Sequence, residues 1–157
     1  MPKEANIDFL SIIKDVFEPV FQNFGFVINN ELEWNGAGEY STTALKDGIA
    51  LVFYVGVSQL FYYCSVSIKL SGEIAEKATS HLRYRSLGVA AIAKGRDPDH
   101  KQPRKAAQTK EEVKAMFEAE KEDLLKYCSD ILSGDVSSWS RIADPLAEEW
   151  EKGRNKR

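Results

Sequence analysis

The chain has 157 residues, of which 43% are hydrophobic, 29% charged and 11% aromatic, a balance that indicates one folded domain with a packed core and excludes a disordered chain. No apolar run approaches the roughly 20 residues needed to span a bilayer, and the N-terminus lacks the pattern of a signal peptide, so we expect a cytoplasmic protein with no membrane partner. The two cysteines, Cys64 and Cys128, lie far apart without a CxxC pair, which favours free thiols in a reducing compartment.

The net charge of −3 conceals an uneven distribution. Residues 81–110 contain eight Lys or Arg and only two Asp. The rest of the chain is therefore acidic, and most of this acidity falls in the C-terminal part. We expect a molecule with a pronounced charge dipole.

Residues 6–24 are predicted to form a helix. Apolar side chains recur there at steps of three and four residues, which places them on one stripe: Phe9, Ile13, Val16, Phe17, Val20, Phe21 and Phe24. Asn6 or Asp8 can cap the helix, and Gly25 is expected to end it. Pro19 is expected to kink or divide it, because proline lacks the backbone donor and crowds the preceding turn.

From Phe26 the apolar period changes to two, which predicts strands. Phe26–Trp34 reads as a half-buried strand whose apolar side is formed by Phe26, Ile28, Leu32 and Trp34, and Ile49–Val57 reads as an apolar strand. Leu60–Leu70 alternates apolar with polar residues, so that Leu60 falls in the set predicted to be buried. Tight turns at Asn35-Gly36 and Asp47-Gly48 join the first three strands. These strands and turns predict a four-stranded antiparallel meander.

The sequence pattern predicts the structure of residues 71–108 less clearly than that of the rest of the chain. Gly72–Thr79 is compatible with a short helix, His81–Ser86 alternates basic with apolar residues, and Leu87–Ala93 is small and apolar. Lys94–Gln108 has two prolines, many charges and no apolar periodicity. We expect residues 94–108 to form an exposed, mobile basic loop.

A long helix is predicted from Thr109 to Ser133. Thr109 and Glu112 fit a capping box at its start, and Gly134 follows its end. A shorter accessory helix is expected from Asp144-Pro145 onward, because this pair matches an N-cap followed by proline in the first turn. The glutamate at position 120 interrupts the apolar stripe of the long helix.

Together these elements predict a single α+β domain over residues 1–157, in the order α-β-β-β-β-α. The four-stranded antiparallel meander sheet carries the N-terminal helix and the long helix on one face. The short C-terminal helix is an accessory.

The sequence contains no recognisable catalytic motif. Neither His81 nor His100 lies in a nucleophile motif. The glycines of Asn35–Gly38 lack the spacing of a phosphate loop, and the acidic and histidine residues of 97–100 are flanked by cations that would repel a metal ion. We therefore assign no catalytic residue, no cofactor and no metal. An enzyme of unrecognised type is kept as an alternative.

Two surfaces are candidates for binding. The first is the outward face of the central strands, where the parity places Tyr54, Phe61 and Tyr63. A sheet with aromatic residues on both faces must be covered on both. The cover is either another helix of the chain, a partner protein, or a second copy in a homodimer.

The second candidate is the basic segment 81–110, which could neutralise phosphates or dock on an acidic protein surface. Its candidate contact residues are Arg83, Arg85, Lys94, Arg96, Lys101, Arg104 and Lys105. A nucleic-acid-associated accessory role is the alternative that this segment supports, although an isoelectric point near 5.5 opposes it.

The first helix ends in Asn23-Phe-Gly-Phe26, and the long helix leads into Tyr127-Cys-Ser-Asp-Ile-Leu-Ser-Gly-Asp135 and Trp139. In these junctions the chain resembles small uncharacterised bacterial α+β proteins, some of which are toxin-immunity or phage-related proteins. The resemblance implies a function by binding a partner and carries over no catalytic residue. The leading hypothesis is a non-enzymatic protein-binding protein, such as an immunity or inhibitor protein.

Overall fold

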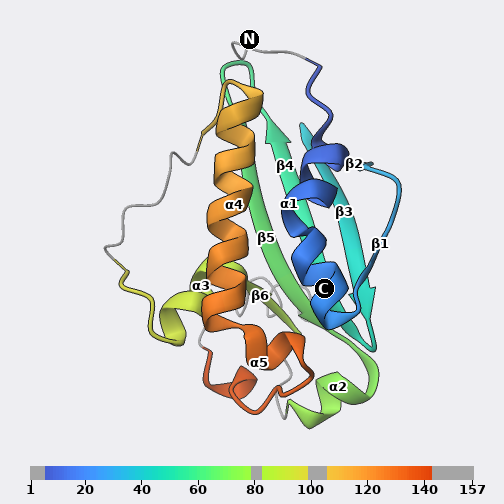
Figure 1. Ribbon diagram of the computed structural model, residues 1–157, viewed down its shortest axis with the longest axis vertical. Helices are drawn as coiled ribbons and strands as arrows, with labels where there is room; N and C mark the ends of the chain where they lie inside the picture. The colour runs from blue at the N-terminus through green and yellow to red at the C-terminus, as the bar shows by residue number, and fades with distance from the viewer. Residues whose placement is uncertain (1–5, 79–82, 99–105, 143–157) are drawn as a thin grey trace, which may run out of the picture.

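The computed structural model describes residues 6–78, 83–98 and 106–142, and it has two layers. An antiparallel sheet forms one layer, and helices α1 and α4 lie side by side on one of its faces (Figure 1). The predicted α+β architecture, with an N-terminal helix and a long later helix on the same face, is confirmed.

The elements follow in chain order. The helices are α1 (Phe9–Phe24), α2 (Gly72–Lys77), α3 (Leu87–Ala93), α4 (Lys110–Tyr127) and α5 (Ser129–Leu132), followed by the 3-10 turn η1 (Trp139–Arg141). The strands are β1 (Val27–Ile28), β2 (Glu33–Gly36), β3 (Glu39–Lys46), β4 (Ile49–Val57), β5 (Tyr62–Leu70) and β6 (Tyr84–Ser86).

The described sheet has six strands rather than the four predicted. The expected strand Phe26–Trp34 is two short strands, β1 and β2, which both pair with β3. Asn29 separates them, because its side chain accepts a hydrogen bond from the Glu31 backbone N–H at 3.2 Å and closes a local turn. The sixth strand, β6, comes from the segment whose pattern was ambiguous, and it pairs with β5 at Ser67–Lys69.

Helix α1 begins and ends as predicted. The Asp8 carboxylate accepts from the Ser11 N–H at 3.1 Å, and Gly25 ends the helix with a φ of +80°. Pro19 does not divide it, since the helix runs through this position. Its apolar stripe is held against the sheet and the neighbouring helix: the Phe17 ring centroid lies 4.7 Å from that of Phe53 and 6.0 Å from that of Phe117.

Helix α4 has the predicted capping box. The Thr109 hydroxyl accepts from the Glu112 N–H at 3.2 Å and lies 3.3 Å from the Glu112 carboxylate. The long helix predicted to reach Ser133 is interrupted at Cys128, whose φ of −121° departs from helical geometry, and α5 follows. The accessory helix predicted at Asp144 lies outside the described residues.

The pairing register assigns every strand residue to a face. Phe53 faces α1 and α4, so residues paired with it, such as Val66, lie on this inner face. The outer face carries the intervening residues, among them Tyr54, Tyr63 and Leu45. The predicted parity of β4 and β5 is therefore confirmed.

Candidate functional site

One end of the sheet carries three exposed large apolar side chains. Trp34 in β2, Val57 at the end of β4 and Leu60 in the β4–β5 turn are 56%, 37% and 58% exposed. The two hairpins are joined there by a hydrogen bond from the Val57 N–H to the Gly38 carbonyl, at 2.6 Å. We call the surface formed by Trp34, Tyr40, Val57 and Leu60 the aromatic end.

The aromatic end borders a groove of about 510 Å³. Apolar and aromatic side chains dominate its lining, including Ile7, Phe9, Leu32, Trp34, Tyr40, Val57 and Tyr62. The Trp34 and Tyr40 ring centroids are 4.8 Å apart, so the two rings form one wall. The groove lies where the chain enters α1, at the upper end of the sheet in Figure 1.

The sequence pattern did not identify the aromatic end. Trp34 and Leu60 fall in the apolar sets that were predicted to be buried, yet both are more than half exposed. The exposure of Leu60 follows from the turn at Ser58. The Ser58 hydroxyl accepts hydrogen bonds from the Leu60 and Phe61 N–H groups, and the chain turns there before β5 begins. Their exposure depends on where the turns lie and where the helices end, which apolar alternation does not encode.

The outer face of the sheet carries the aromatics predicted there, but it is largely hydroxylic. Tyr63 is 47% exposed, and Phe61 packs edge-on against it with ring centroids 6.5 Å apart. Tyr54 is half-buried beside Tyr84. Burial is the main cause that raises the pKa of the Tyr54 hydroxyl, and the neighbouring Tyr84 is the second cause. The other side chains of this face include Ser41, Thr43, Ser65 and Ser67. A continuous apolar surface is not formed among these residues.

The predicted basic residues do not form one surface in the described part of the chain. Arg83 is exposed, whereas Lys94 pairs with Asp130 and Arg96 pairs with Asp123. Residues 94–108 were expected to form a mobile loop, but both of its described ends are held in place. The ion pairs of Lys94 and Arg96 hold one end, and at the other end Ala107 is buried and exchanges two backbone hydrogen bonds with Tyr62. Three further predicted contacts, Lys101, Arg104 and Lys105, lie outside the described residues.

Arg85 is buried, with only 2% of its surface exposed. The register of β6 places it on the inner face opposite Ile68. Its Nε donates to the Ile142 carbonyl at 2.9 Å, one Nη donates to the Tyr84 carbonyl at 2.8 Å, and its guanidinium lies 5.1 Å from the Trp139 ring centroid. This arginine is part of the core and cannot contact a partner without unfolding.

The two cysteines are not activated nucleophiles, and the described residues hold no cluster of metal ligands. Cys64 and Cys128 are free and buried, and burial is the main cause that raises the pKa of each thiol to about 12. Both are therefore protonated at neutral pH and unreactive. Within the described ranges no group of three or more His, Cys, Asp or Glu side chains could hold a metal ion.

No helix in the described part of the chain is long and apolar enough to cross a membrane. No family model matches the chain, and no significant similarity to a curated protein or to a solved structure was found.

Proposed function

We propose that the chain functions by binding another protein, and that the aromatic end carries the contact. The observation that supports this most is the exposure of Trp34 and Val57 in the lining of one apolar groove, with Leu60 exposed in the turn that follows Val57. Tryptophan is among the residues that contribute most to protein interfaces, since it buries a large rigid surface with little loss of conformational entropy. A groove beside it accepts an apolar side chain of the partner.

The exposed carboxylates next in sequence to the aromatic end lie on the other face of the sheet. Glu33 pairs with Ser41 and Glu39 with Gly56, so both belong to the outer face, whereas Trp34 and Tyr40 belong to the inner face. The proposed contact is therefore mainly apolar.

The alternative nucleic-acid role has less support from the described residues. It relied on a basic surface, but Arg85 is buried and both Lys94 and Arg96 are held in ion pairs with the acidic helices α4 and α5. Phosphate binding would have to break those pairs. An immunity or inhibitor role stays a prediction that the identity of the partner would decide.

The test is affinity capture from the native host with matched variants. Leu60 and Leu45 are both 58% exposed, but Leu45 lies on the outer face of β3. Trp34→Ser and Leu60→Ser should each reduce capture of one stoichiometric protein by about tenfold or more, whereas Leu45→Ser should leave it unchanged. Nuclease and added salt should have little effect, because the contact is mainly apolar.

Loss of capture with Leu45→Ser alone would place the contact on the outer face and contradict the proposal. Capture of nucleic acid that added salt abolishes would support the alternative. If the captured protein is the chain itself and Trp34→Ser reduces its capture, the partner is a second copy of the chain.

A further inference from the structure

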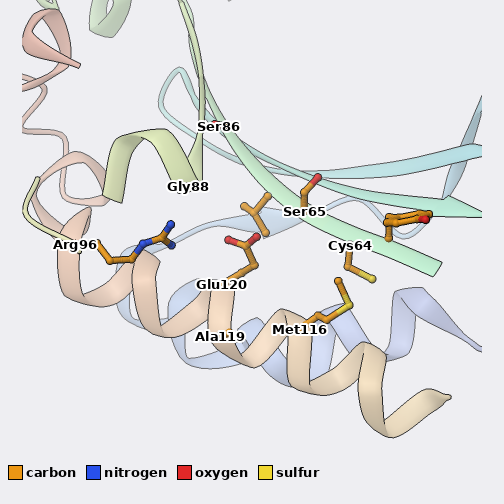
Figure 2. A pocket seen from close by; sticks show the side chains of 10 residues that line it. Cys64, Ser65, Ser86, Gly88, Arg96, Met116, Ala119 and Glu120 are labelled. Atoms are coloured by element: carbon orange, nitrogen blue, oxygen red, sulfur yellow. The ribbon is translucent and has the colours of Figure 1, made fainter. Parts of the chain in front are cut away.

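A second pocket, lined by both charged and apolar side chains, lies along β5 at the edge of the sheet. It has a volume of about 380 Å³ and lies between β5, the start of α3 and the middle of α4. Figure 2 shows the Glu120 carboxylate and the Arg96 guanidinium pointing into the same space, with Cys64 and Met116 along the wall. This volume is in the range of sites for small molecules.

One wall of the pocket is the edge of β5 at Cys64. Tyr62 bonds through its N–H and its carbonyl to Ala107, and the Leu70 N–H bonds to the Arg83 carbonyl, so alternate residues of β5 direct their backbone groups away from β4. Strand β6 pairs with β5 only at Ser67–Lys69. Cys64 therefore lies between the part of the edge that β6 occupies and the part that Ala107 occupies.

This gap is closed at both ends by the chain itself. Strand β6 occupies the edge from Ser67 onward, and Ala107 occupies it at Tyr62. A strand of a partner protein could not run along β5 without meeting one of them. The occupant that fits is therefore a small molecule with hydrogen-bonding groups.

The two charged groups of the pocket each have an unused hydrogen-bonding position. Arg96 directs one Nη to Asp123, while its buried Nε has no partner among the described residues. The Oε2 atom of Glu120 is also buried and has no partner there. A buried donor and a buried acceptor that stay unpaired are each costly, and this indicates a site that a ligand or ordered water completes.

We propose that this pocket binds a small zwitterion of the amino-acid class, with its ammonium on Glu120 and its carboxylate on Arg96. The guanidinium edge that carries Nε is the one that Asp123 leaves open, and such an edge suits a carboxylate. The edge of β5 at Cys64, which lines the pocket, contacts the remainder of the ligand. The proposal concerns a different surface from the aromatic end and is independent of it.

Binding should depend on pH through Glu120. Burial, then the charge of Asp123 on the same helix, raise the pKa of Glu120 to about 7, and Arg96 partly opposes this. Cys64, which faces it from β5, stays protonated because its pKa is about 12. An ammonium binds the ionised carboxylate, so affinity should increase as pH rises through about 7.

The test is a titration of the isotopically labelled full chain with each standard amino acid, followed by backbone amide NMR. At least one should shift the amides of Cys64–Val66 and Glu120 saturably. Two analogues of the amino acid that binds most tightly serve as comparisons: the amine that lacks its carboxylate and the acid that lacks its ammonium. Each should bind at least about tenfold more weakly than the amino acid. Glu120→Gln should cause a similar loss and remove the pH dependence.

Glu122→Gln is the matched control, because Glu122 is exposed on the same helix. It should bind like the native chain, and the NMR spectrum of each variant reports whether it is folded. The proposal is overturned if no amino acid shifts the Cys64–Val66 amides. It is also overturned if the amine binds as tightly as the amino acid, or if Glu120→Gln binds like the native chain.

Discussion

At the scale of single residues, Arg85 illustrates how a charged side chain can belong to a core. It donates hydrogen bonds to two backbone carbonyls, and the Trp139 ring covers its guanidinium. The bond to Ile142 ties β6 to the segment that follows η1. A buried cation with these partners stabilises the packing of chain segments that are distant in sequence.

We expect Arg85→Ala to lower the free energy of unfolding by about 3 kcal/mol, since it removes the hydrogen bonds and leaves a cavity against Trp139. Arg83→Ala is the control, because Arg83 is exposed two residues away, and it should change stability by less than about 0.5 kcal/mol. Urea unfolding followed by tryptophan fluorescence measures both. Equal effects would show that Arg85 is not held in the core.

The sequence could not have predicted this role. His81–Ser86 alternates basic with apolar residues, and both Arg83 and Arg85 were predicted to be contact residues of the basic segment. Arg85 instead faces inward, because its partners at positions 139 and 142 are more than fifty residues away. The same limit applies to Glu120. The sequence shows that Glu120 interrupts the apolar stripe of the long helix, but it does not show that Arg96 lies in the same pocket.

At the scale of elements, the turns fix the register of the sheet. Gly36 and Gly48 both adopt positive φ, +86° and +85°. A Cβ at Gly48 would lie 2.5 Å from the Ser71 carbonyl oxygen, whereas a Cβ at Gly36 would meet nothing. The turn after β3 is thus packed against the end of β5 at Gly48, whereas the turn after β2 faces open space at Gly36.

This difference predicts unequal costs for the same substitution. Gly36→Ala should cost about 1 kcal/mol, the penalty of a left-handed conformation alone. Gly48→Ala adds the clash with Ser71 and should cost about 3 kcal/mol or more. Thermal or urea unfolding of the two variants distinguishes them, and equal losses would contradict the close approach of Gly48 to Ser71.

Elements with a strong local signal were predictable from the sequence. The apolar stripe and caps of α1, the capping box of α4 and the alternation of β5 all correspond to the structure. The short strand β6 was not predictable, because three residues carry too little pattern and their pairing with β5 is long-range. The break of the long helix at Cys128 was not predictable either, because the apolar stripe continues through this position to Ile131 and Leu132.

At the scale of the whole molecule, helices α1 and α4 cover the inner face of the sheet (Figure 1). Phe53 and Val66 are buried on this face. Trp34 in β2 and Leu60 in the β4–β5 turn stay exposed, although their sequence pattern is that of core residues. The aromatic end contains these exposed side chains, and the proposed protein-binding function depends on them.

Site-specific photo-crosslinking in the native host tests this central claim most directly, because it captures a partner whose identity is still to be determined. A photoreactive phenylalanine analogue is placed at position 60, and at position 45 as the control of equal exposure. The account predicts a crosslink to one protein from position 60 and none to that protein from position 45. A crosslink from position 45 alone would move the contact to the outer face of the sheet and contradict the account.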